Sequence, residues 1–136
     1  MDIIEVNDLT ELKAVLINDY GKFDTVLDLG TGIRPFNLVP SMRITCVEPY
    51  AEYRRYLNLN FSGENLQTIN SYIENLTNVI DVDSFDAVTI MDVVEHIEKQ
   101  SVLATLKGII AAGANRIIIF TPEGFMPQHT VDVDAW

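Results

Sequence analysis

The chain has 136 residues, the size of one domain, and 48% of them are hydrophobic, so a substantial core can form. Nine Lys and Arg residues stand against 20 Asp and Glu residues, which gives a net charge of -11. Nucleic-acid binding depends on neutralising phosphates, so this charge argues against DNA or RNA as a partner. We expect one domain over residues 1–136, either complete or a piece of a longer chain.

Cysteine content and hydropathy predict the compartment. Cys46 is the single cysteine, so no disulfide forms within the chain, which is typical of a reducing compartment. The first residues lack the basic segment of a signal peptide. The apolar run at residues 108–120 is interrupted by Asn115 and Arg116 and is too short to span a bilayer. These features predict a cytoplasmic protein with no membrane partner.

Helical and β-rich patterns alternate along the chain. The first helix is predicted to begin at Asn7 or Asp8, which can cap it, and to end at Gly21. Further helices are predicted from Pro49 to residue 60, from Ser71, which has capping-box spacing to Glu74, and over residues 95–112, with Leu103 and Ile110 among its inward side chains. The predicted strands are residues 25–30, 43–48, 66–70, 85–91 and 116–121.

Strands separated by helices indicate βαβ units and a parallel sheet. The run at residues 117–120 is apolar on both faces, as in central strands covered by helices. The predicted fold is α/β: a Rossmann-like, doubly wound sheet of about five parallel strands, order 3-2-1-4-5, in three layers. Ligands of such sheets bind at the carboxyl ends of the strands.

A Gly-x-Gly turn, Gly30-Thr31-Gly32, directly follows the first predicted strand. Without a Cβ, the backbone of such a turn can approach a ligand closely, although an ordinary strand-to-helix turn has the same pattern. Glu48 ends the second strand, where an acid accepts hydrogen bonds from ribose hydroxyls in nucleotide-binding folds. The alternative for Glu48 is a surface residue that caps the helix beginning at Pro49.

Asp28 distinguishes between two nucleotide classes. Dinucleotide-binding strands usually have an apolar residue here and a third glycine in the turn, whereas this turn continues as Arg34-Pro35. An acid before the turn suits a ligand with a cationic group. Alternatively, Asp28 accepts hydrogen bonds from loop amides and shapes the turn, and both roles can hold together.

Four segments together resemble the class I S-adenosylmethionine-dependent methyltransferases, of the small-molecule type: "VLDLGTG", "CVEPY", "FDAVTIMDVVEHIEK" and "IIIFTPEG". The resemblance covers strands one to five. It implies S-adenosylmethionine as cofactor, S-adenosylhomocysteine as product and a small-molecule acceptor. It also implies the following cofactor-binding residues: Asp28, Gly30, Thr31, Gly32, Glu48, Pro49, Tyr50, Asn70, Ser71, Met91 and Asp92.

Glu95 and His96 follow strand four and are the candidate catalytic residues, with His96 as a general base. The alternative is that both stabilise the start of the helix that follows, or that His96 packs against the ligand. Strand four lacks the Asn/Asp-Pro-Pro-aromatic motif of methyltransferases that act on nucleic-acid bases. No His–Cys cluster has metal-ligand spacing, so no metal site is predicted.

The chain departs from the pattern of the resembled family at its C-terminus, where we expect strands six and seven to be absent. A non-catalytic domain that binds the same cofactor, or acts as an interaction module, therefore stays open as an alternative. A nicotinamide-dependent oxidoreductase is a third hypothesis, disfavoured by Asp28 and Arg34-Pro35. An unpaired fifth strand invites association, so we expect the tail at 123–136 or another copy of the chain to cover it.

Overall fold

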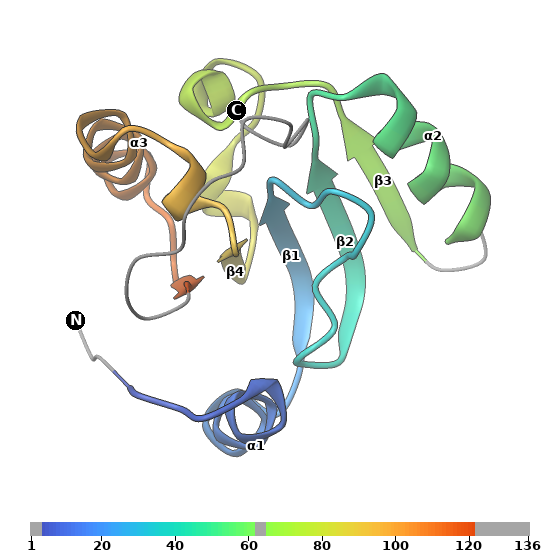
Figure 1. Cartoon of the computed structure of the whole chain (residues 1–136), viewed down its shortest axis with the longest axis vertical. Helices are drawn as coiled ribbons and strands as arrows, with labels where there is room; N and C mark the ends of the chain where they lie inside the picture. The colour runs from blue at the N-terminus through green and yellow to red at the C-terminus, as the bar shows by residue number, and fades with distance from the viewer. Residues whose placement is uncertain (1–3, 62–64, 122–136) are drawn as a thin grey trace.

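The structure is a computed structural model that describes residues 4–61 and 65–121 (Figure 1). In chain order its elements are α1 (Leu9–Tyr20), β1 (Phe23–Leu29), β2 (Ser41–Val47), α2 (Ala51–Asn60), β3 (Leu66–Ile69), the 3-10 helices η1 (Ile73–Asn78) and η2 (Val82–Ser84), β4 (Ala87–Met91), the 3-10 helix η3 (Val94–His96), α3 (Lys99–Ala111) and β5 (Ile117–Phe120).

The five strands form one sheet in the order β3-β2-β1-β4-β5, and every neighbouring pair is parallel. The predicted fold class and strand order are therefore confirmed. The register sets Asp28 of β1 beside Cys46 on one neighbouring strand and beside Thr89 on the other. The carboxyl end of β1 thus lies at the middle of the sheet, where the chain changes direction across it.

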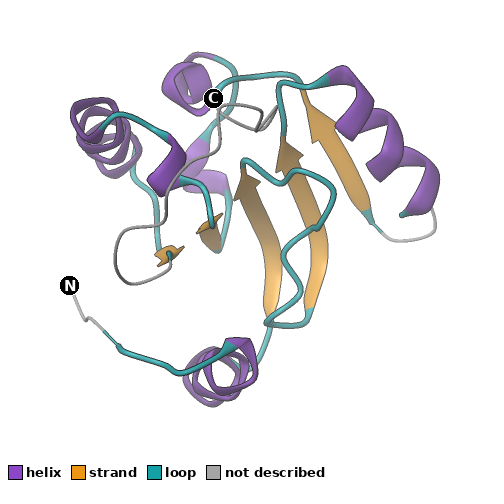
Figure 2. Cartoon of the chain, viewed as in Figure 1, coloured by secondary structure: helices purple, strands orange, loops and turns teal. Residues whose placement is uncertain are grey.

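Alternating side chains of the central strands supply two separate cores, because successive residues of a strand point to opposite faces. One core lies with η1 and α3 and includes Leu27, Leu29, Val47, Leu76, Val88, Ile90 and Ile109. The other lies with α1 and includes Leu12, Leu16, Val26, Phe36, Leu38, Val39 and Ile118. Helices and loops therefore cover the sheet on both faces, giving three layers (Figure 2).

The connection between β1 and β2, residues 30–40, contains no helix. It crosses the sheet as an extended loop, as Figure 1 shows in blue-green. Phe36, Leu38 and Val39 of this loop are buried and join the same core as Leu12 and Leu16 of α1. Side chains of this loop thus cover the face of the sheet where a crossover helix would otherwise pack. The loop covers this face only in part.

The predicted boundaries of α1 are confirmed by its caps. The Asp8 side chain accepts a hydrogen bond from the amide of Glu11 at 2.8 Å, as an N-cap residue does. Gly21 follows the helix with a φ of 70°, a conformation that glycine adopts without a Cβ clash. Both caps involve contacts between residues a few positions apart, so they can be predicted from the sequence.

The helix predicted over residues 95–112 is wrong at its start. Residues 94–96 form the separate 3-10 turn η3, and Ile97 after it is extended, so α3 begins at Lys99. Leu103 and Ile110 are exposed rather than inward, with 48% and 63% of their surface accessible, whereas Ile109 is buried. The helix is rotated so that Ile109 and half-buried Leu106 face the sheet.

Two other helix starts differ from prediction. α2 begins at Ala51, with Pro49 outside the helix. The helix predicted from Ser71 is the 3-10 helix η1, which begins at Ile73, and the Ser71 hydroxyl donates to the carbonyl of Tyr72 instead of capping it. Competing local hydrogen bonds of serine explain this difference.

β5 is the edge of the sheet in the described residues, as the predicted strand order requires, although its apolar run is typical of a strand covered on both faces. Ile119 accordingly has 40% of its surface exposed, while its neighbour Ile118 is buried in the core with α1. The tail expected to cover this edge lies outside the described residues.

Candidate functional site

The turn after β1 has the backbone of a glycine turn. Gly30 and Gly32 have φ values of 68° and 59°, in the left-handed region that favours glycine. The Gly30 amide donates to the carbonyl of Val47 at 2.9 Å, which joins the turn to the end of β2. A Cβ built on Gly32 meets no atom within 4 Å, so the backbone here faces open space.

Asp28 lies beneath this turn and is almost fully buried. One carboxylate oxygen accepts a hydrogen bond from the Thr89 hydroxyl at 2.7 Å, and the other accepts one from the Phe36 amide at 3.0 Å. Burial raises the pKa of Asp28 to about 6, against the lowering effect of these hydrogen bonds. The loop-shaping role of Asp28, which the sequence left open beside ligand binding, is therefore present in the fold.

Glu48 at the end of β2 has no exposed surface. Its Oε2 accepts a hydrogen bond from the Gly32 amide at 2.8 Å, and its Oε1 accepts one from the Tyr50 amide at 2.9 Å. The alternative of a surface glutamate is wrong, and the contact of Glu48 with α2 is to the amide of the N-cap residue Tyr50. Asp28 and Glu48 together hold the loop at two of its amides, those of Gly32 and Phe36.

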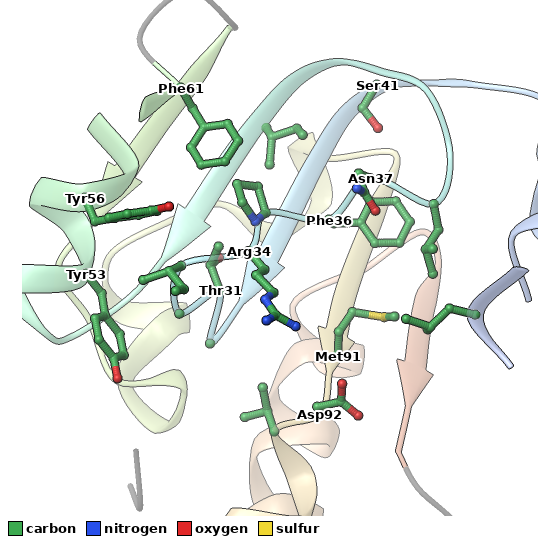
Figure 3. A pocket seen from close by; sticks show the side chains of 18 of the residues that line it. Thr31, Arg34, Phe36, Asn37, Ser41, Tyr53, Tyr56, Phe61, Met91 and Asp92 are labelled. Atoms are coloured by element: carbon green, nitrogen blue, oxygen red, sulfur yellow. The ribbon is translucent and has the colours of Figure 1, made fainter. Parts of the chain in front are cut away.

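A cavity of about 1030 Å³ surrounds the loop and reaches the carboxyl ends of β1 and β4 (Figure 3). In Figure 3 the loop residues pass between the aromatic side chains of α2 and the end of β4. The lining comprises Leu9, residues 30–41, Ile44, Tyr50, Tyr53, Tyr56, Phe61, Met91, Asp92, Val93 and His96.

The fold brings together around this cavity seven of the residues that the sequence indicated: Gly30, Thr31, Gly32, Tyr50, Met91, Asp92 and His96. Thr31 is buried, and its hydroxyl donates to the carbonyl of Asp28 at 3.0 Å. Asp28 and Glu48 lie behind the loop instead of lining the cavity. Their contact with a ligand stays a prediction.

Pro49, Asn70, Ser71 and Glu95 do not line the cavity. Asn70 follows β3 and accepts a hydrogen bond from the Arg54 guanidinium at 3.2 Å. The same guanidinium donates to the carbonyls of Glu48 and Pro49. A cofactor-binding role for Asn70 and Ser71 is thus not visible in this geometry and stays a prediction.

Asp92 directly follows β4, and the predicted catalytic pair, Glu95 and His96, lies in η3 after it. Asp92 adopts a φ of 53°, unusual for a residue other than glycine, and its amide donates to the carbonyl of Phe120 at 2.9 Å. Burial, and then the charge of Glu95, raise the pKa of Asp92, while His96 acts to lower it. Nε2 of His96 lies 3.9 Å from Oε1 of Glu95, and Oε2 of Glu95 accepts a hydrogen bond from the Thr121 hydroxyl at 3.3 Å. Of the pair, His96 borders the cavity.

Sequence reasoning missed Thr89, which donates to the Asp28 carboxylate, and Arg54, which donates to the backbone carbonyl of Glu48. Thr89 is the lone hydroxyl in the apolar run of β4, and it is fully buried. The sequence does show a polar residue in the apolar run of each of two strands, Asp28 and Thr89. That the two form a pair follows only from the register of β1 with β4.

The described residues contain no group of three or more His, Cys, Asp or Glu side chains placed to hold a metal ion. Among the helices in the same part of the chain, none has both the length and the apolar character needed to cross a membrane.

Solved structures share this fold at low sequence identity. The PH0226 protein from Pyrococcus horikoshii superposes with a TM-score of 0.64 at 17% identity, over 82% of this chain and 55% of its own. A SAM-dependent methyltransferase from Leishmania major gives 0.67 at 15% identity, over 82% and 48%. DhpI, solved as a complex with SAH, gives 0.54 at 16% identity, over 73% and 50%. This chain therefore spans about half the length of these proteins. A search of curated proteins finds no match.

A family model described as a methyltransferase domain matches residues 27–117, from the middle of β1 to the start of β5. The matched region contains the glycine turn, Glu48, the end of β4 and the Glu95–His96 pair. The chain belongs to the methyltransferase domain family, of the class I S-adenosylmethionine-dependent type that its sequence resembles.

Proposed function

We propose that the domain binds S-adenosylmethionine in the cavity beside the Gly30–Gly32 turn and transfers its methyl group to a small-molecule acceptor. The observation that carries this proposal is the convergence of the glycine turn, Tyr50 and Asp92 on one cavity at the carboxyl ends of the strands. Doubly wound sheets bind their ligands at this place. The solved DhpI–SAH complex, which shares the fold, supports the choice of donor.

The cavity is large enough for a nucleoside joined to an amino acid, since small-molecule pockets span roughly 300–1,000 Å³ and this one holds about 1030 Å³. The open space at Gly32 suits a ligand lying against the backbone. Glu48, however, is buried behind the loop amides. A ribose reaches its carboxylate only if the Gly32 amide moves aside, so a contact between the ribose and Glu48 requires a local shift of the loop.

When bound, the donor supplies an activated methyl group on a sulfonium, and the protein has to align it with the acceptor. The turn and Tyr50 would position the donor, and the end of β4 would face the acceptor. His96 borders the cavity and is the candidate base for an acceptor that carries a proton. Glu95, 3.9 Å from His96 and bonded to Thr121, would orient the imidazole.

A non-catalytic domain that binds the same cofactor is the alternative. It is favoured by one observation: the chain spans about half the length of the solved structures that share its fold. Acceptor contacts supplied by the remaining half of such proteins would then be missing from this chain.

Isothermal titration calorimetry with S-adenosylhomocysteine and with NAD tests donor binding. We expect saturable binding of S-adenosylhomocysteine and none of NAD. No detectable heat at millimolar S-adenosylhomocysteine contradicts the proposal, and tighter binding of NAD supports an oxidoreductase instead.

A methyl-transfer assay with S-adenosylmethionine over a panel of small metabolites then separates the two remaining alternatives. Methylation of any panel member by the 136-residue chain supports the enzyme. Binding of the donor without turnover on any of them favours the non-catalytic domain.

A further inference from the structure

Arg34 lies in the loop after the glycine turn and borders the cavity. Its amide donates to the carbonyl of Thr31 at 3.2 Å, and two residues later the Phe36 amide is held by Asp28. The backbone at Arg34 is thus fixed on both sides. Figure 3 shows its guanidinium extending from the loop toward the end of β4, where Met91 and Asp92 lie.

Within the described part of the chain, the guanidinium of Arg34 makes no hydrogen bond and no ion pair, and it has no acid within 4 Å. Two other arginines are engaged: Arg54 donates to three oxygens, and Arg116 lies 5.1 Å from the centre of the Tyr20 ring. Acids outnumber bases 20 to nine in this chain, yet none of those that the structure describes lies within 4 Å of this guanidinium. The charge of Arg34 is therefore available for a ligand.

We propose that Arg34 binds a carboxylate of the ligand that occupies the cavity. The planar guanidinium presents paired N–H groups whose spacing matches the two oxygens of a carboxylate. This inference rests on the proposed function, and it names a chemical feature of the ligand. Two sources can supply the carboxylate: the amino-acid group of the donor, or the acceptor.

The charges that face Arg34 favour the donor as the source. Asp92, at the end of β4, is the acid among the residues lining the cavity, and in Figure 3 it lies across the space toward which Arg34 extends. A cation on the loop and an anion on β4 complement a zwitterion, with its carboxylate at Arg34 and its ammonium toward Asp92. The amino-acid group of S-adenosylmethionine is such a zwitterion.

The test compares three nucleoside ligands by calorimetry on the 136-residue chain and its Arg34→Gln variant. S-Adenosylhomocysteine carries the amino-acid carboxylate, decarboxylated S-adenosylhomocysteine lacks only this group, and 5′-methylthioadenosine lacks the whole amino-acid part. We expect Arg34→Gln to weaken S-adenosylhomocysteine roughly 10- to 100-fold, the effect of losing a charged hydrogen bond, and to leave the other two ligands unchanged.

Arg55→Gln is the matched control, because it removes the same charge from an exposed residue of α2 that does not line the cavity. Arg34→Lys keeps the positive charge but loses the paired N–H groups of the guanidinium. Its affinity for S-adenosylhomocysteine should therefore lie between those of the unmodified chain and Arg34→Gln. Equal thermal stability of the variants, by circular dichroism, excludes a folding effect.

If Arg34→Gln leaves the affinity for S-adenosylhomocysteine intact but abolishes methylation of carboxylic acids in the metabolite panel, the acceptor is the source, and the inference stands. Unchanged affinity together with unchanged turnover overturns it and leaves the proposed function in place. Failure of the unmodified chain to bind S-adenosylhomocysteine overturns the proposed function, and the inference with it.

Discussion

The carboxylate of Glu48 accepts a hydrogen bond from the amide of Gly32 at 2.8 Å, which joins the end of β2 to the glycine turn after β1. The same carboxylate accepts from the amide of Tyr50, where α2 begins. One fully buried side chain therefore connects two strands and a helix at the place where a donor ribose is expected. Glu48 has a structural role in this conformation, whatever its role toward ligand.

Replacing Glu48 should affect both stability and binding. Glu48→Gln leaves one amide, of Gly32 or Tyr50, opposite an N–H group, so we expect the free energy of unfolding to fall by about 1–3 kcal/mol, the cost of an unsatisfied buried group. Affinity for S-adenosylhomocysteine should fall as well. Urea unfolding and calorimetry measure the two effects. Glu52→Gln, at an exposed position of α2, is the control, and unchanged affinity in Glu48→Gln would remove Glu48 from the donor site.

Gly32 and Gly21 form a matched pair that separates strain from ligand contact. Both have positive φ, 59° and 70°, and at both an added Cβ meets nothing within 4 Å. Gly32→Ala and Gly21→Ala should therefore each lower stability by roughly 1–2 kcal/mol through backbone strain. Because only Gly32 of the two borders the cavity, Gly32→Ala alone should weaken S-adenosylhomocysteine. Equal affinities in the two variants would place the donor elsewhere.

Asp28 should make stability depend on pH. Its pKa is raised from 3.8 to about 6 in the fold, so between these values the folded state binds more protons than the unfolded state. The free energy of unfolding should then decrease as pH rises from about 4 to about 6 and level off above pH 7.

Asp28→Asn does not titrate, so the difference in unfolding free energy between the unmodified chain and this variant isolates the contribution of Asp28. Urea unfolding from pH 4 to pH 8 measures it. A difference that is constant over this range, or that rises with pH, would contradict the raised pKa.

His96 should matter for turnover and little for donor binding. If it removes a proton from the acceptor, His96→Ala lowers kcat and leaves the affinity for S-adenosylhomocysteine nearly unchanged, since general-base catalysis contributes typically 10²–10⁴-fold. Glu95→Gln should lower kcat less, because Glu95 acts on the imidazole at 3.9 Å. Turnover that survives His96→Ala would show that methyl transfer here needs alignment alone.

The exposed edge of the sheet should promote association. β5 has no neighbour on its outer side among the described residues, and Ile119 is exposed. We expect light scattering to find an oligomer at micromolar concentration and Ile119→Lys to shift it toward the monomer. Leu59→Lys, on the exposed side of α2, is the control. A monomer at all concentrations would rule out another copy of the chain as the cover of this edge.

The parts of the fold that the sequence predicted depend on neighbouring residues. Asp8 and Gly21 mark the two ends of α1, and caps involve contacts within a few positions of the chain. The five strands were predicted from apolar runs, because strands covered on both faces need apolar residues on both sides. The exposure of Leu103 and Ile110 was not predictable in this way, because the rotation of α3 depends on packing against the sheet.

The sequence by itself determined the fold class, the glycine turn and the presence of acids at the ends of the first two strands, because these are matters of local residue order. The tertiary structure alone decided what those acids do. Asp28 meets Thr89 through the register of β1 with β4, across 61 positions of the chain, and Glu48 meets Gly32 across 16. Hydrogen bonds between residues so far apart follow from strand order and pairing, which only the folded sheet specifies.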